Sequence, residues 1–445
     1  MNGGSSNATS TSTHGSTTAP GRSSTSALSP EREQPMTDPK RFAPVLAKAE
    51  ELGKRFALTA RHYDETGEFP FANFDALHEA GLLGLVTATE HGGLGGGLTD
   101  ALAVVSAIAR GEPSTALVLS MHYNQHYSVR TSGKWPPHLV ERVTRANREG
   151  VALINAAQVE PRVGSPSHGS LPETIARRVG DQWRITGHKT YATGIPLLRW
   201  VAVLAVTDEP EPRLGSFLVP TSADGIRVEK TWNATGMRAT NSDDLILDDV
   251  AIPLEDVLEI APASEGLKRD ERMGAWYFSL VPAIYDGAAR GARDWLIDFT
   301  TSRAPASLGA PLSTVPRIQD GLGEIEVLLT VNRRLLRSIA EDFDSGRAFG
   351  ADAAAVKHTV IANAITVTTL ALELGGNPGI SRDNPLERHH RDALSGKAHA
   401  PQNNLIRMML AKAAFSRHAA THAVALDPVP VRSHQQPRLA VVGRS

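Results

Sequence analysis

The sequence contains no cysteine, and its side-chain charges nearly cancel. The absence of cysteine excludes disulfides, thiolate metal sites and thiol nucleophiles, and it fits a reducing compartment, for which we predict the cytoplasm. The 46 basic and 48 acidic residues give a formal net charge of -2, so no strong field steers the chain toward nucleic acid or an anionic membrane. We therefore expect a small organic molecule as the ligand.

Long apolar runs are also missing. No continuous run approaches the roughly 18 to 20 residues that a membrane helix needs, so we expect no membrane span. Residues 1–38 are rich in serine and threonine and have few apolar side chains to bury, which predicts a disordered leader. The leader lacks the continuous apolar stretch of a secretory signal. Met36, just before the first helical pattern, is an alternative start of the native chain.

The rest of the chain has an ordinary globular composition, with 41% hydrophobic and 21% charged residues. Over residues 39–149, apolar residues recur every three or four positions, which predicts a helical domain. Residues 150–260 change to short β-rich runs separated by glycine, proline and aspartate, typical of a small antiparallel β-domain. Helical patterns return over residues 267–425, before a tail of residues 426–445. The predicted fold class is α+β, mainly α.

Three local motifs suggest chemistry but lack the context that it requires. The glycine-rich segment 91–97 has no strand before it and no acidic residue at the spacing of a dinucleotide-binding fingerprint. His122 and His126 share a helical face, but no third ligand or HExxH glutamate accompanies them, so we predict no metal site. Ser167 stands beside His168 without a nucleophile elbow, which argues against a serine hydrolase.

Longer stretches resemble the acyl-CoA dehydrogenase-like flavoproteins from about residue 40 to 425. They are FPFANFDALHEAGLLGLVTATEHGGLGGG and EPSTALVLSMH in the first helical region, EPRVGSPSHG, ITGHKTYATG and GMRATNSDDLILDDVAIP in the β-region, and LELGGNPG with LERHHRDA in the last. The resemblance implies that the last region is a four-helix bundle. It also implies a flavin, FAD or FMN, bound between the β-domain and this bundle in a homotetramer.

The resemblance further assigns contacts to the flavin. Tyr191 and Thr193 match positions that pack on and hydrogen-bond the flavin ring, and as alternating strand residues they would face the same side. Without the resemblance, a buried strand aromatic would be the better interpretation of Tyr191. Val159 replaces a threonine that hydrogen-bonds the flavin. The remaining predicted flavin contacts are Ser165, Arg303, Gly375 and Gly376.

The catalytic base of an acyl-CoA dehydrogenase is missing from both positions where this family carries it. The family uses a glutamate to remove the α-proton of an acyl thioester while a hydride passes to the flavin. The common position, counted from the RDA of residues 391–393, is Ala400, and the minority position is Tyr277. Segment 389–404, which we expect to connect two helices, offers His399 instead.

A histidine in this loop resembles the two-component flavin monooxygenases of the same fold, which include dibenzothiophene monooxygenases. A separate reductase supplies these enzymes with reduced flavin, which then reacts with oxygen. Imidazole titrates near neutral pH, so His399 could deprotonate a substrate or donate a hydrogen bond. Leu372 stands where a glutamine contacts the adenosine half of the flavin, and Pro378 interrupts the neighbouring motif. Weaker contacts there would suit a flavin that arrives from a reductase.

We therefore expect a monooxygenase of a small organic substrate, with a flavin reductase or an electron-transfer protein as partner. One alternative is an acyl-CoA or acyl-carrier-protein dehydrogenase whose base is Glu373 or Asp392. Another is a non-catalytic flavoprotein, although the mildly basic C-terminus gives little support for nucleic-acid binding. Arg388, Arg391 and Asp392 are expected to form an ion-pair cluster that braces the loop. The predicted substrate pocket consists of Met121, His122, Trp276 and Tyr277.

Overall fold

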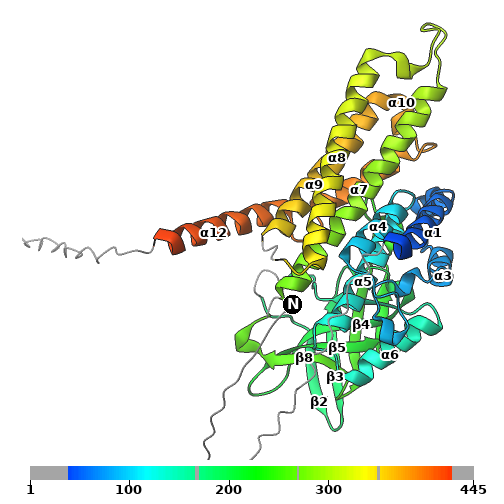
Figure 1. The fold of residues 1–445 in the computed structure, drawn as a ribbon. Coiled ribbons are helices and arrows are strands. Elements are labelled where there is room, and N and C mark those ends of the chain that lie inside the picture. The colour runs from blue at the N-terminus through cyan, green and yellow to red at the C-terminus, as the bar shows by residue number, and fades with distance from the viewer. Residues whose placement is uncertain (1–38, 166–169, 268–269, 348–350, 423–445) are drawn as a thin grey trace, which may run out of the picture. The chain divides into compact units, whose positions relative to one another are not determined.

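The computed structural model describes residues 39–165, 170–267, 270–347 and 351–422 of the chain. The predictions made for the leader and for the tail of residues 426–445 lie outside these ranges, as do Ser167 and His168. Within them the order is helices, then a sheet, then helices, as Figure 1 shows from blue through green to red. This is the predicted order of helical and β-rich regions.

The first region is built around an apolar helix. Its helices are α1 (Pro39–Ala57), α2 (Ala60–Thr66), α3 (Phe71–Glu79), α4 (Leu98–Ala109), α5 (Pro113–Thr131) and α6 (Pro137–Glu149). Helix α4 is apolar on most of its surface and packs against α1 on one side and against α5 and α7 on others. At the start of α5, the Glu112 carboxylate accepts hydrogen bonds from the backbone N–H groups of Ser114 and Thr115.

The middle region is one sheet. Its strands are β1 (Leu153–Ala157), β2 (Ile175–Val179), β3 (Gln182–Lys189), β4 (Leu198–Thr207), β5 (Arg213–Pro220), β6 (Ile226–Glu229), β7 (Asp244–Pro253) and β8 (Val257–Pro262). The strand order is β6-β7-β3-β2-β4-β5-β8, with β1 also paired to β4. Most pairs are antiparallel, but β4 runs parallel to both β1 and β2.

The last region is a bundle of long helices. They are α7 (Glu271–Ser302), α8 (Pro316–Asp344), α9 (Asp352–Gly375), α10 (Asn377–Ile380), α11 (Leu386–Leu394) and α12 (Asn403–His422). Helix α9 packs against α7 and α8, and α11 packs against α7 and α9. Helix α7 also contacts α4 and α5, which joins the bundle to the first region.

Helix α9 is long and apolar enough to cross a membrane by length and composition alone, with a mean hydropathy of 1.3 over an 18-residue window. A continuous apolar run does not occur there, because Lys357 and His358 interrupt it. Helices α7, α8 and α11 pack against α9, and the Lys357 side chain is buried. These contacts are those of a core helix in a bundle.

The segment between α11 and α12 is shorter than predicted. Segment 389–404 was expected to be a connection, but α11 continues to Leu394 and a 3-10 turn follows over Ser395–Lys397. Helix α12 begins at Asn403. Buried side chains on α11, including Leu386 and Ala393, keep it helical through the charged stretch.

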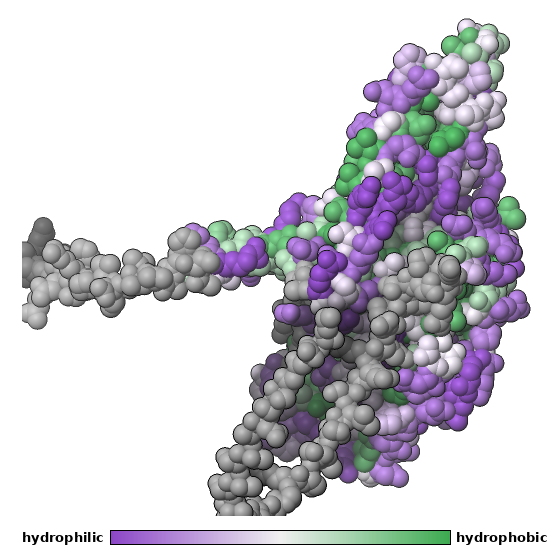
Figure 2. All heavy atoms as spheres, in the orientation of Figure 1, coloured by the Kyte–Doolittle hydropathy of each residue, from purple (hydrophilic) through white to green (hydrophobic). Residues whose placement is uncertain are grey.

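Some apolar side chains on the bundle remain exposed. Val327 and Val331 on α8 are 63% and 40% exposed, and Met408 and Phe415 on α12 are 47% and 75% exposed. Figure 2 shows apolar atoms on the bundle helices and on α12 beside hydrophilic ones. Exposed apolar patches of this kind are typical of surfaces that bind another chain.

Candidate functional site

His399 is held by three side chains from two helices. The hydroxyl oxygen of Tyr277 lies 2.9 Å from Nε2, and that of Tyr285 lies 2.7 Å from Nδ1. Both tyrosines belong to α7. The ammonium of Lys357, on α9, donates hydrogen bonds of 3.0 Å to the backbone carbonyls of His399 and Pro401. The loop after α11 is therefore fixed against α7 and α9 by its backbone and by both ring nitrogens of its histidine.

The hydrogen bonds of this group run in one direction. The Tyr277 hydroxyl also lies 3.2 Å from the carbonyl oxygen of Ala400, to which it can only donate. If Nε2–H donates to Tyr277, Nδ1 must accept from Tyr285, and every hydrogen has an acceptor. The opposite direction leaves the Tyr285 hydroxyl hydrogen without an acceptor among the described residues. We therefore assign the Nε2–H tautomer to His399.

The members of the His399 group that could act as a base are neutral at physiological pH. Burial, and secondarily the charge of Lys357, lowers the pKa of His399 to about 3. Burial raises the pKa values of Tyr277 and Tyr285 well above the usual value for a phenol. The expectation that this imidazole titrates near neutral pH is therefore wrong. His399, Tyr277 and Tyr285 offer neutral hydrogen-bond donors and acceptors rather than a ready base, while burial lowers the pKa of Lys357 to about 8.

No carboxylate hydrogen-bonds to His399, Tyr277 or Tyr285 within the part of the chain that the structure describes. Glu373, one of the two alternative bases, is exposed on α9. Asp392, the other, is buried and accepts a 2.6 Å hydrogen bond from the Met237 backbone N–H. Burial raises the pKa of Asp392 to about 7, so its carboxyl group is poised to exchange a proton near neutral pH.

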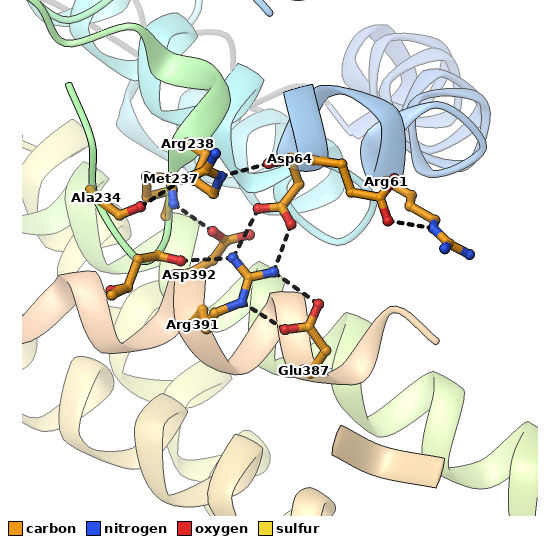
Figure 3. A network of polar contacts seen from close by, with 10 residues as sticks. Arg61, Asp64, Ala234, Met237, Arg238, Glu387, Arg391 and Asp392 are labelled. Atoms are coloured by element: carbon orange, nitrogen blue, oxygen red, sulfur yellow. Dashed lines mark hydrogen bonds and ion pairs between the residues drawn. The ribbon is translucent and has the colours of Figure 1, made fainter. Parts of the chain in front are cut away.

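Arg391 anchors α11, which leads into the His399 loop. Figure 3 shows its guanidinium between two carboxylates. The nearest distances to the oxygens of Asp64, on α2, and Glu387, one helical turn earlier, are both 2.6 Å. Arg391 also donates to the carbonyl oxygen of Thr235 at 2.7 Å. Gly236 follows, and a Cβ there would lie 2.2 Å from the Arg391 carbonyl oxygen, so this close approach requires glycine.

This arrangement corrects the predicted ion-pair cluster. Arg391 pairs with Asp64 and Glu387 and not with Asp392, because neighbouring residues on a helix point in different directions. Asp392 binds a backbone amide instead. Arg388 makes no ion pair with any described residue, although its charge opposes the rise in the pKa of Asp392, four residues later on α11.

Tyr191 lies in a separate pocket at the end of β3. The pocket has a volume of about 390 Å³. Its lining residues are Val159, Glu160, Pro161, Gly164, Thr190, Tyr191, Thr231, Trp232, Ser242 and Asp244. Strand β3 ends at Lys189, and Tyr191 has a φ of 58°, so the predicted strand alternation of Tyr191 and Thr193 is wrong. A positive φ is unusual for a bulky residue, and it leaves this ring 61% exposed.

The pocket fits a planar ring with a polar edge. The Tyr191 and Trp232 rings meet edge to face, with centroids 6.3 Å apart. The Thr190 hydroxyl is buried and has no hydrogen-bond partner in the structure, so it is available to a ligand. The Thr193 hydroxyl lies 2.9 Å from that of Ser242, which lines the pocket. An aromatic face with an unpaired hydroxyl beside it is what the predicted flavin requires.

The other predicted flavin contacts lie elsewhere. Ser165 is the last described residue before the undescribed segment 166–169. Arg303 is exposed at the end of α7, with its guanidinium 5.8 Å from the Phe299 ring centroid. Gly375 ends α9 against Trp295, where a Cβ would lie 3.0 Å from the indole, and Gly376 has a φ of 60°. Their roles toward a flavin stay predictions.

The predicted substrate residues are divided between the His399 group and the core. Only Tyr277 bonds to His399. His122 is buried, and its Nε2 lies 3.1 Å from the Leu83 carbonyl oxygen. Trp276 is buried and stacks on Tyr127 with centroids 4.0 Å apart, while Met121 is partly buried against the same core. Among the described residues, no hydrogen bond or ring contact joins the His399 group to Tyr191 or Thr193.

Sequence reasoning missed four members of these sites, Lys357, Tyr285, Thr190 and Trp232. Lys357 is a single cation in an apolar helix, which is a usable signal, because a buried lysine needs polar partners. Tyr285 lacks any such signal, since its position on α7 is that of a core residue. Thr190 was overlooked beside Tyr191. No group of three or more histidine, aspartate or glutamate side chains with metal-site geometry occurs in the described ranges.

Comparison with known proteins identifies the family. Models of the acyl-CoA dehydrogenase N-terminal, middle and C-terminal domains match residues 47–134, 156–250 and 281–415. YdbM of Bacillus subtilis strain 168, named provisionally as an acyl-CoA dehydrogenase, is 31% identical over 83% of this chain and 96% of its own.

Solved structures have the same fold. FMN-bound TdsC from Paenibacillus sp. A11-2 is 23% identical, with a TM-score of 0.74 over 82% of this chain and 95% of its own. Methanesulfinate monooxygenase MsuC from Pseudomonas fluorescens is 22% identical, with a TM-score of 0.73 over 84% and 97% of the two chains. With all three family domains matched in order, the chain belongs to the acyl-CoA dehydrogenase family of flavin-dependent oxidoreductases.

Proposed function

We propose that this protein is a flavin-dependent monooxygenase of a small organic substrate. The observation that carries the proposal is the His399 group, which occupies the region of the family's base with neutral hydroxyls and an imidazole. A dehydrogenase must remove a weakly acidic α-proton, which requires a basic group beside the substrate. A monooxygenase requires instead hydrogen-bond donors beside the place where oxygen reacts.

In this proposal the Tyr191 pocket binds the flavin, and the His399 group supplies hydrogen bonds where oxygen reacts. Tyr191, Trp232 and Thr190 would hold the flavin ring, and the bound flavin, once reduced, supplies two electrons to molecular oxygen. One oxygen atom enters the substrate and the other leaves as water. Tyr285 and His399 fix the orientation of the Tyr277 hydroxyl, whose hydrogen points away from Nε2 to the Ala400 carbonyl and would have to turn from it to reach a bound acceptor. Because His399, Tyr277 and Tyr285 are neutral, they would bind an acceptor without removing a proton from the substrate.

The proposed reaction and the exposed surface of the bundle each imply a protein partner. Two-electron reduction of the flavin calls for a reductase or an electron-transfer protein. The exposed Met408 and Phe415 on α12 and the exposed valines on α8 suit burial against further copies of the chain, which we propose to be a homotetramer. The fold shared with FMN-bound TdsC and with the monooxygenase MsuC agrees with this function.

Replacing Tyr191 with alanine is expected to weaken FMN binding about tenfold, because stacking on an aromatic ring contributes on the order of 1 kcal/mol beyond burial. Fluorescence titration of the apoprotein with FMN measures the effect. Tyr191→Phe keeps the ring and should bind within about twofold of the wild type. Equal affinity in the alanine variant would remove Tyr191 from the flavin site. Leu171→Ala, at an exposed position outside the pocket, is the control.

The function itself is tested by reducing bound FMN or FAD without oxygen and then mixing with oxygenated buffer in a stopped-flow spectrophotometer. A monooxygenase should show a transient whose spectrum belongs to neither reduced nor oxidised flavin. Direct return of the oxidised spectrum in one phase, with both flavins, argues against the proposal.

The second candidate is an acyl-CoA dehydrogenase, which the name of YdbM and the pKa of Asp392 favour. Its base would be Asp392, and Asp392 would have to turn from the Met237 amide toward the substrate. Anaerobic mixing of the oxidised flavoprotein with acyl-CoA thioesters of several chain lengths tests this. Bleaching of the flavin absorption by any thioester would replace the monooxygenase with the dehydrogenase.

A further inference from the structure

A cavity that opens to the surface lies among the helices, separate from the His399 group and from the Tyr191 pocket. It has a volume of about 890 Å³ and is enclosed by α1, α4, α7, α8 and α11. Small-molecule sites have volumes of roughly 300 to 1,000 Å³, so the cavity is large enough for an organic ligand. Leu102, Trp295 and Leu336 give part of its wall an apolar surface. None of the residues that bond to His399 or line the Tyr191 pocket lines this cavity.

Arg388 lines the cavity as a buried cation, and the charged group that it influences is the Asp392 carboxyl, four residues later on α11. It is only 5% exposed, and its Nε is buried without a hydrogen-bond partner. No ion pair or hydrogen bond joins its side chain to any residue in the described ranges. Its neighbour His389 is 3% exposed, and Nδ1 of that ring also lacks a partner. Buried charged and polar groups are normally paired, so two unpaired neighbours facing one cavity indicate a missing ligand.

The charge of the lining has the sign that an anion requires. Six lysine or arginine side chains face four carboxylates around the cavity. Two of those carboxylates are already paired, Asp294 with Arg110 and Asp286 with Arg290. Arg333, on α8, lines the opening without an ion pair in the described structure. Arg337 pairs with Glu341, so Lys54, Arg333 and Arg388 remain against Glu50 and Asp298, an excess of one cation among the described lining residues.

We propose that this cavity binds a small organic anion, with Arg388 holding its phosphate or carboxylate group. The planar guanidinium of arginine donates two parallel hydrogen bonds to either kind of oxyanion, and burial strengthens such a pair. The apolar wall near Trp295 and Leu336 takes the carbon skeleton of the same molecule. The proposal does not depend on the reaction catalysed at the His399 group.

Calorimetric titration of the purified flavoprotein with hexyl phosphate, hexanoate and 1-hexanol tests the proposal. The three probes share one carbon chain and differ in the head group, so they separate a phosphate ligand from a carboxylate and both from apolar binding. At least one anion should bind with one molecule per chain, and hexanol should not. Arg388→Gln should weaken that binding at least tenfold, in line with the loss of a charge-assisted pair. Arg382→Gln, at an exposed position outside the cavity, should leave it unchanged.

Two further measurements keep the test decisive. Arg333→Gln changes an exposed position that also lines the cavity, and it should weaken the anion several-fold without risk to folding. His399→Ala should leave the affinity for the anion unchanged, because His399 does not line the cavity. This variant excludes the possibility that hexanoate binds in a substrate pocket near His399. The proposal is overturned if neither anion binds, if Arg388→Gln binds as tightly as the wild type, or if His399→Ala abolishes binding.

Discussion

Replacing His399 with alanine is expected to shorten the transient that precedes flavin reoxidation about 100-fold, because one oriented hydrogen-bond donor at a reacting centre contributes roughly 100- to 1,000-fold. The substitution removes the partner of both the Tyr277 and the Tyr285 hydroxyls at once. The Tyr277 hydroxyl then loses its fixed direction. Stopped-flow absorbance measures the lifetime of the transient. The yield of hydrogen peroxide measures how much reduced flavin is reoxidised without oxygenating a substrate.

Two variants show whether His399 acts through its hydrogen bonds. Tyr285→Phe removes only the donor to Nδ1 and should shorten the transient about tenfold, the effect of a single hydrogen bond. His390→Ala, on α11, removes a histidine that bonds Thr368 outside the group and should change nothing. FMN affinity should stay the same in all three variants. An unchanged lifetime in His399→Ala, with flavin still bound, would show that His399 has no part in the reaction.

The sequence was sufficient for the order of the elements but not for the partners of single side chains. Helical and strand periodicities report burial along one element, so they predicted helices, sheet and helices correctly. They carry no information on contacts between distant elements. The bond from Tyr285 to His399 crosses 114 residues, and nothing local distinguishes this tyrosine from its core neighbours on α7.

Local rules failed where the backbone departs from a regular element. Alternation placed Tyr191 and Thr193 on one side, but β3 ends before them and Tyr191 takes a positive φ. Charge alone placed Arg391 beside Asp392, although helix geometry turns adjacent residues apart and favours Glu387 at four residues. The family motif identified which loop to examine. Only the folded chain shows that its partly buried histidine lies between two phenols, and desolvation there lowers its pKa to about 3.

Replacing Arg391 with methionine is expected to lower the free energy of unfolding by about 3 kcal/mol or more, the usual cost of removing one partner of a buried ion pair. The side chain is 19% exposed, and Asp64 and Glu387 are 9% and 16% exposed, so both carboxylates would lose a partner that water replaces only in part. Urea denaturation followed by circular dichroism measures the change. Arg61→Met, at an exposed ion pair on α2, is the matched control and should unfold near the wild-type midpoint.

Arg391→Met also tests whether the anchoring of α11 affects the reaction at His399. Arg391 ties α11 to α2 and to the Thr235 carbonyl, and α11 leads directly into the loop that carries His399. Loosening this anchor should therefore shorten the flavin transient while FMN affinity at the Tyr191 pocket stays unchanged. Asp64→Asn should destabilise the protein by a similar amount, and adding Arg391→Met to it should cost less than the single changes together. Additive losses would mean that Arg391 and Asp64 stabilise the fold independently, which contradicts the bidentate pair seen in the structure.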